Sequence, residues 1–137
     1  SLRRGRPRES VPWNRGMKSC LVVDDSKVVR SIAVKTLSHM GFRCTEAADG
    51  RQALDAAAAE TPDLALLDWN MPVMSGIEFL KEFRGTAEGA QPKVVFCTTE
   101  NDVERIQEAL EAGADEYIMK PFDAEILHDK LSQIGMA

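Results

Sequence analysis

Leu64-Ala65-Leu66-Leu67-Asp68 is a short apolar run that stops at a carboxylate, and three more apolar runs in the sequence stop at a polar residue. The other runs are Leu21-Val22-Val23 before Asp24-Asp25, Val94-Val95-Phe96-Cys97 before Thr98, and Tyr117-Ile118-Met119 before Lys120-Pro121. If the four runs are parallel strands of one sheet, their polar residues gather at its carboxyl edge, where open α/β sheets bind ligands. Three carboxylates, a hydroxyl and an ammonium then converge, which predicts a cation-assisted phosphorylation site.

Strand-like and helix-like segments alternate along the chain. Short apolar runs bounded by turn residues predict strands, and apolar residues three and four positions apart predict helices. The predicted strands span 19–24, 42–47, 63–67, 93–97 and 115–119, and the predicted helices span 26–40, 50–60, 76–84, 101–112 and 123–134. Strands that alternate with helices form a parallel sheet covered on both faces. We therefore predict an α/β fold of five βα units, a flavodoxin-like doubly wound parallel sheet with strand order 2-1-3-4-5.

Capping residues and apolar stripes support three of these helices. Ser26, Asn101 and Asp123 are expected N-caps because their side chains can accept a hydrogen bond from the first turn. Gly41 and Gly113 are expected to end helices, since glycine readily adopts the left-handed conformation found there. The apolar positions are Val29, Ile32, Ala33, Leu37 and Met40 at helical spacing, Val103, Ile106 and Leu110 on one face, and Ile126, Leu127, Leu131 and Ile134 facing inward.

Length and composition describe one domain behind a short basic extension. The 137 residues suffice for a single core, and no apolar run approaches the ~18–20 residues that span a membrane. Residues 1–16 hold five arginines and one glutamate without periodicity, so we predict a disordered basic extension, with the domain over 17–137 and a natural start at Met17. A nucleic-acid-binding arm is the alternative for this extension.

Charge and cysteine usage favour a cytoplasmic protein. The whole chain has a formal net charge of −5 despite its basic extension, so the domain itself is acidic, which argues against nucleic-acid binding by the folded part. No secretory signal is visible, and we expect no membrane contact. Cys20, Cys44 and Cys97 lack metal-like spacing, so we expect buried reduced thiols rather than a redox role.

The carboxylates at the predicted edge are candidate ligands of Mg²⁺, which takes carboxylate and carbonyl oxygens and keeps waters for a phosphoryl group. We predict that Asp25 and Asp68 bind it directly, Asp24 through water, and Asn70 through its carbonyl. Taken alone, an Asp-Asp pair after a strand is equally compatible with a helix cap beside a solvated neighbour.

Asp68 is the candidate nucleophile, because an aspartate can attack a phosphoryl group to give an acyl phosphate. Lys120 would supply a movable positive charge and Thr98 a hydroxyl donor. Nucleotide sites are not indicated, since the sequence has neither GxGxxG after the first strand nor GxxxxGK[ST]. His39 and His128 fall late in predicted helices, which favours helix-end or surface positions over catalysis.

These residues carry a resemblance to a known family. The set Asp24-Asp25, Asp68, Thr98 and Lys120-Pro121 resembles the receiver domain of two-component response regulators. The segment Asp68-Trp69-Asn70-Met71-Pro72, followed by Ser75-Gly76, resembles the single-domain, CheY-like regulators of chemotaxis. The resemblance covers about residues 18–135.

The resemblance implies a phosphorylation switch. Asp68 would be the phosphoacceptor, Mg²⁺ the cofactor, and a histidine kinase, a histidine phosphotransfer protein or a small donor such as acetyl phosphate the phosphoryl source. Thr98 would move towards the phosphate, Tyr117 would rotate into the vacated space, and Lys120 would contact the phosphate before a cis peptide at Pro121. The partner face for a downstream protein effector would comprise Val103, Ile106, Leu110, Tyr117 and Lys130.

Individual positions refine that expectation. Asn70 and Glu100 stand where the family tunes hydrolysis of the acyl phosphate, and both match the chemotaxis type, so a short-lived phosphoryl group is expected. Thr99 is bulkier than the small residue common there and narrows access. Val103 and Ile106 replace a more basic patch, which puts binding to a flagellar switch in doubt.

Three functions compete on the sequence. A phosphorylation-controlled interaction module is favoured over an enzyme, and the chain ends just after its last predicted helix, which favours a stand-alone monomer over a fragment of a longer regulator. A Mg²⁺-dependent aspartyl-phosphate phosphatase is the second candidate, but Asn70 occupies the position of its acid. An unphosphorylated interaction module with a vestigial site is the third. Dimerisation through the 101–112 helix on phosphorylation also stays open.

Overall fold

Five parallel strands form one sheet in the computed structural model, in the order β2-β1-β3-β4-β5. The structure describes residues 18–69, 71, 74–86, 92–99 and 103–137, apart from the side chain of Val103. The strands are β1 (Lys18–Val23), β2 (Phe42–Ala47), β3 (Leu64–Asp68), β4 (Lys93–Thr98) and β5 (Glu116–Met119). The helices are α1 (Lys27–His39), α2 (Gly50–Ala59), α3 (Gly76–Arg84), α4 (Val103–Glu111) and α5 (Ala124–Gln133). The predicted fold class and strand order are therefore confirmed, with element ends shifted by one or two residues.

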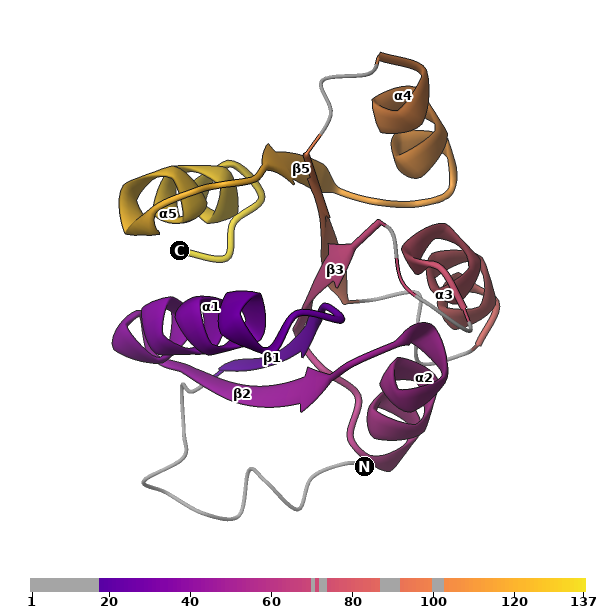
Figure 1. Cartoon of the computed structure of the whole chain (residues 1–137), viewed down its shortest axis with the longest axis horizontal. Helices are drawn as coiled ribbons and strands as arrows, with labels where there is room; N and C mark the ends of the chain where they lie inside the picture. The colour runs from indigo at the N-terminus through magenta and orange to yellow at the C-terminus, as the bar shows by residue number, and fades with distance from the viewer. Residues whose placement is uncertain (1–17, 70, 72–73, 87–91, 100–102) are drawn as a thin grey trace.

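The sheet separates two cores. Helices α1 and α5 cover one face, and α2, α3 and α4 cover the other (Figure 1). On the first face Leu37, Leu127 and Leu131 are fully buried against the strands. On the second face Phe79 and Phe83 stack with ring centroids 5.2 Å apart and are equally buried. All five residues of β3 are buried, as expected for a central strand of a parallel sheet.

The helix ends follow the predicted chemistry where the structure describes them. The Ser26 side chain accepts a hydrogen bond from the Val29 N–H at the start of α1, and Asp123 caps α5 in the same way. Gly41 and Gly113 have φ of 95° and 112°, which confirms them as helix stops. The predicted cap Asn101 lies outside the described residues.

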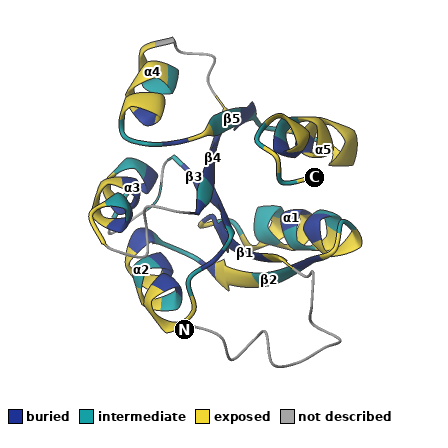
Figure 2. Ribbon diagram, turned by 180° about the vertical axis from the view of Figure 1, so that it is seen from behind, coloured by how far each residue is buried: buried dark blue, intermediate teal, exposed yellow. Residues whose placement is uncertain are grey.

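The apolar stripes are narrower than the sequence indicated. Ile126, expected to face inward, is 43% exposed, and Ile32 and Leu110 are 54% and 44% exposed. The prediction for Ile126 was wrong because the inward line of α5 runs through Leu127 and its neighbour one turn on, and a helical step of 100° puts the preceding residue on the flank. Figure 2 shows the same pattern, with a thin buried line on α1, α4 and α5.

Arg84 joins three segments at the edge of the sheet opposite the strand ends that carry Asp68 and Thr98. Its guanidinium donates to the carbonyl of Gly113 from Nε and Nη2, at 3.1 and 2.7 Å, and to the carbonyl of Pro92 at 2.7 Å. Nη2 also contacts the Asp115 carboxylate at 3.1 Å. The end of α3, the approach to β4 and the turn between α4 and β5 are thereby held together.

Among the residues that the structure describes, no helix combines the length and the apolar character needed to cross a membrane.

Candidate functional site

Three carboxylates meet at the carboxyl edge of the sheet. Asp24 and Asp25 directly follow β1, and Asp68 is the last residue of β3, the strand that pairs with β1. The order of the strands along the sheet reverses between β1 and β3, so α1 and α3, the helices that follow them, lie on opposite faces of the sheet (Figure 1). A crevice therefore forms at the carboxyl ends of these two strands. One oxygen from each carboxylate lies within 4.8 Å of the others. The predicted convergence of these three residues is therefore confirmed.

Lys120 extends into this cluster from the end of β5. Its Nζ lies 2.6 Å from Oδ2 of Asp24 and 3.1 Å from Oδ1 of Asp68. Burial alone would lower the pKa of Lys120, but its hydrogen bonds to the two carboxylates outweigh burial and raise that pKa. The lysine thus stays charged, and it balances only one of three negative charges.

The ionised form of Asp68 is disfavoured in this setting. It is 8% exposed, and burial raises the pKa of its carboxyl. The hydrogen bond from Lys120 opposes that rise, while the neighbouring charges of Asp24 and Asp25 add to it. A further cation would relieve the repulsion among the carboxylates.

The donor set fits Mg²⁺. The ligand atoms are hard carboxylate oxygens. The three carboxylates and Lys120 together have a formal charge of −2, which a divalent cation would neutralise, and Asp25 is exposed to solvent. Asp24 has both carboxylate oxygens engaged, because Oδ1 also accepts from the Ser26 N–H at 2.9 Å. The predicted contact of Asp24 with the ion through water stays a prediction.

The switch candidates lie beside this cluster. Thr98 is 6% exposed at the end of β4, and its carbonyl accepts from the Lys120 N–H at 2.7 Å. Tyr117 is half-buried on β5, where the Lys130 ammonium sits 4.4 Å from the centre of its ring. Thr98, Tyr117 and Ile106 line one cavity of about 10 Å³, about the smallest volume that admits a single water.

Trp69 connects the phosphoacceptor candidate to α4, a link that the sequence analysis missed. Its ring lies 5.1 Å from that of Phe96, and the Arg105 guanidinium lies 5.2 Å from its centre. Trp69 directly follows Asp68 in the sequence, and Arg105 is in the first turns of α4. A tryptophan and an arginine so far apart in the chain give no pairing signal in one sequence.

An apolar groove of about 300 Å³ opens next to Lys120, and the sequence analysis missed it as well. Its lining residues are Val29, Ile32, Thr99, Lys120, Pro121 and Phe122. The Lys120–Pro121 peptide is cis, as predicted. The groove could not be read from the sequence because it depends on how far α1 stands from the segment after β5.

Some predicted site residues cannot be placed. Asn70 and Glu100 lie outside the described residues, as does the side chain of Val103, so their roles stay predictions. Leu110 is exposed, Ile106 is half-buried, and Lys130 pairs with Glu116 at 3.6 Å.

Comparison with known proteins agrees with this geometry. The family model for the response regulator receiver domain matches residues 20–132. Chemotaxis protein CheY-3 of Vibrio cholerae is 42% identical over 122 residues, covering 88% of this chain and 93% of that protein. Sporulation initiation phosphotransferase F of Bacillus subtilis is 36% identical over 113 residues, covering 82% of this chain and 90% of that protein.

Solved structures give the same result. Chemotaxis protein CheY4 of Vibrio cholerae superposes with a TM-score of 0.83 at 37% identity, covering 87% of this chain and 99% of that one. The receiver domain of the sensor histidine kinase PA1611 from Pseudomonas aeruginosa, solved with a magnesium ion coordinated in its active site cleft, gives 0.76 at 28% identity, covering 83% and 93%. With the fold, the acidic cluster and both comparisons in agreement, this chain belongs to the response regulator receiver domain family, whose members act as phosphorylation-based switches in two-component signalling.

Proposed function

We propose that Asp68 accepts a phosphoryl group and that the modified domain then binds a protein effector. The observation that carries this proposal is the convergence of Asp24, Asp25, Asp68 and Lys120 at one edge of the sheet. The phosphoryl donor would be a histidine kinase or a histidine phosphotransfer protein, in the cytoplasm. The domain would work as a signalling module over 17–137 and not as an enzyme with a separate substrate.

Asp68 supplies the nucleophilic oxygen in this proposal. Asp25 and Asp68 would hold Mg²⁺ directly, Asp24 through water, and Asn70 through its carbonyl. The bound ion would supply neutralising charge for the phosphoryl oxygens. Lys120 already contacts Asp68 and is placed to donate to the incoming phosphoryl group without a large movement.

The switch would transmit the new charge from Asp68 to the surface of α4, β5 and α5. A phosphoryl group adds roughly −1.5 to −2 charges and new acceptor oxygens, which the Thr98 hydroxyl would approach. The cavity beside Thr98 and Tyr117 holds only about one water, so the tyrosine ring needs the space that the threonine leaves. The proposed effector face comprises Val103, Ile106, Leu110, Tyr117 and Lys130.

The test is phosphorylation by acetyl phosphate with Mg²⁺, followed by intact mass. We expect one added phosphoryl group on the wild type, none on Asp68→Asn, and none with EDTA. Asp129→Asn removes an exposed aspartate on α5 and is the matched control, which should be modified like the wild type. Modification of Asp68→Asn, or an unmodified wild type, would refute the proposal.

The lifetime of the phosphoryl group tests the predicted role of Asn70. We expect Asn70→Arg to change the half-life of the acyl phosphate, measured by mass after the donor has been removed. An unchanged half-life would count against a role for Asn70 in hydrolysis.

A further inference from the structure

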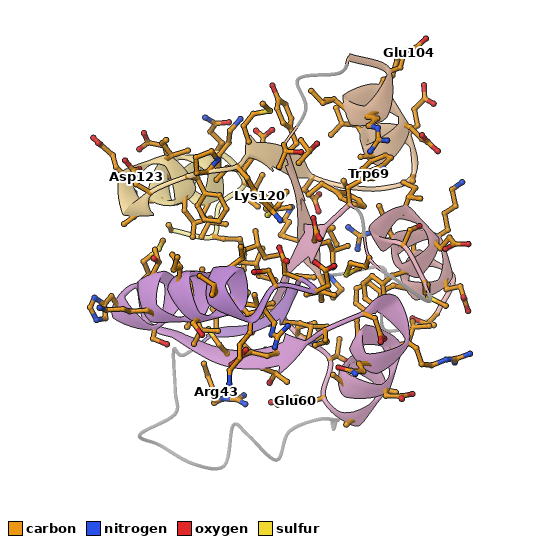
Figure 3. All side chains as sticks on the ribbon, viewed as in Figure 1. Arg43, Glu60, Trp69, Glu104, Lys120 and Asp123 are labelled. Carbon is orange, nitrogen blue, oxygen red and sulfur yellow. The ribbon has the colours of Figure 1, made fainter. Side chains whose placement is uncertain are left out.

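An apolar groove lies beside Lys120, a residue of the site. Ile32 and Val29 of α1 form one wall, and Pro121 and Phe122 form the other. Lys120, which is labelled in Figure 3, lines the groove. It also belongs to the carboxylate cluster, since its Nζ lies 3.1 Å from Oδ1 of Asp68. The groove has a volume of about 300 Å³, which is at the lower limit for pockets that bind small molecules.

We propose that this groove binds the acyl chain of small acyl phosphates, so that the domain is phosphorylated faster by donors with a short apolar chain than by acetyl phosphate. The inference rests on the proposed function and specifies its class of small-molecule donor. The donor combines a phosphoryl dianion with an apolar tail. Those two parts match an apolar recess that includes Lys120 in its lining, since the ammonium of that lysine lies 3.1 Å from the Asp68 carboxylate.

The reaction balances without another reactant. A carboxylate oxygen of Asp68 bonds to phosphorus, and the bond between phosphorus and the acyl oxygen breaks. The electron pair of that bond leaves with the acyl carboxylate, so no proton is transferred. The acyl chain stays attached to the leaving oxygen during the transfer, and a groove that holds the chain also orients the leaving group.

The expected size of the effect follows from the apolar area that the groove can cover. Full burial of one methylene is worth ~0.8 kcal/mol, and the groove is open on one side. Butyryl phosphate has two methylenes more than acetyl phosphate. The efficiency of phosphorylation by butyryl phosphate should therefore exceed that by acetyl phosphate about fourfold if the chain is half covered, and about fifteenfold if it is fully covered.

The experiment compares initial rates of phosphorylation with acetyl, propionyl and butyryl phosphate at saturating Mg²⁺. The three leaving acids have nearly equal acidity, so the three donors have nearly equal intrinsic reactivity at phosphorus. Ile32→Ser removes an apolar wall of the groove at a position that is 54% exposed. Val28→Ser is the matched control, because Val28 lies on the same helix, is 69% exposed and is not among the lining residues.

We expect the ratio of butyryl to acetyl efficiency to be at least fourfold in the wild type and in Val28→Ser, and to fall below twofold in Ile32→Ser. A ratio below twofold in the wild type, with acetyl phosphate still active, would overturn the groove assignment and leave the proposed function intact. A full ratio retained in Ile32→Ser would also overturn the assignment. Failure of all three donors would overturn the proposed function together with this inference.

Discussion

Gly76, the first residue of α3, packs directly behind the phosphoacceptor candidate. A Cβ at this position would lie 2.2 Å from the carbonyl oxygen of Asp68 and 2.8 Å from the ring of Phe96. Ordinary contact begins near 3.4 Å, so the Asp68 carbonyl or the start of α3 has to retreat by roughly 1 Å. The obstacle is backbone at the end of a fully buried strand, which cannot move without disturbing the sheet. We therefore expect Gly76→Ala to cost about 3 kcal/mol of unfolding free energy, at the upper end of the overpacking range.

Urea denaturation monitored by circular dichroism measures that cost, and a thermal scan should show a melting point lower by about 10 °C. Gly85→Ala is the control, since Gly85 is exposed with a helical backbone and a Cβ there would lie 3.3 Å from its nearest neighbour, the Glu82 carbonyl. Gly85→Ala should change the free energy of unfolding by less than ~0.5 kcal/mol. Alanine restricts the unfolded chain, which stabilises the protein, and this gain offsets the slightly tight contact with Glu82. If Gly76→Ala also stays within 0.5 kcal/mol of the wild type, the close packing of α3 against Asp68 is not what the structure indicates.

Three further predictions follow from the site and its surroundings. The raised pKa of Asp68 means that its ionised form disfavours folding above that pKa and that the penalty vanishes as the pH falls through it. Without Mg²⁺, Asp68→Asn should therefore be more stable than the wild type in urea at pH 7, and the difference should shrink towards pH 4; an equal difference at both pH values would contradict the shift. Lys130→Met removes the cation from the ring of Tyr117 and should cost less than ~1 kcal/mol in urea denaturation; a loss above 2 kcal/mol would show that more than a surface contact depends on it. Arg105→Met removes the guanidinium from Trp69 and should change the emission of that residue in the folded protein, whereas an unchanged spectrum would place the arginine elsewhere.

The sequence was sufficient to predict the sheet and the charged residues of the site. A parallel sheet of known strand order brings the carboxyl ends of its strands together, so Asp24, Asp25, Asp68 and Lys120 could be grouped before any coordinate was known. Their grouping needs only the topology, because each residue sits at a strand end. The pairing of Lys120 with both Asp24 and Asp68 needs side-chain positions, and it was not predicted.

Contacts made by helix flanks were beyond sequence reasoning. Periodicity marks an apolar stripe but does not say where its border with solvent falls, and Ile126 and Ile32 are on the exposed side of that border. The contact of Arg105 with Trp69 depends on the distance between α4 and the loop after β3. Ala109 of α4 is buried in the core, but its sequence position does not tell how closely the helix approaches Trp69.

Arg84 has a mechanical consequence for α4. The arginine fixes the carbonyl of Gly113, just beyond the C-terminal end of the helix, while the N-terminal end at Val103 stands on the side of the sheet that carries Asp68. We expect α4 to respond to the site as a lever that pivots at its anchored end, and not as a body that slides over the sheet. Nine residues span about 13 Å, so a tilt of only about 5° displaces the far end by about 1 Å. The contacts of Arg84, at the sheet edge opposite Asp68, would then determine the direction in which the proposed effector face can move.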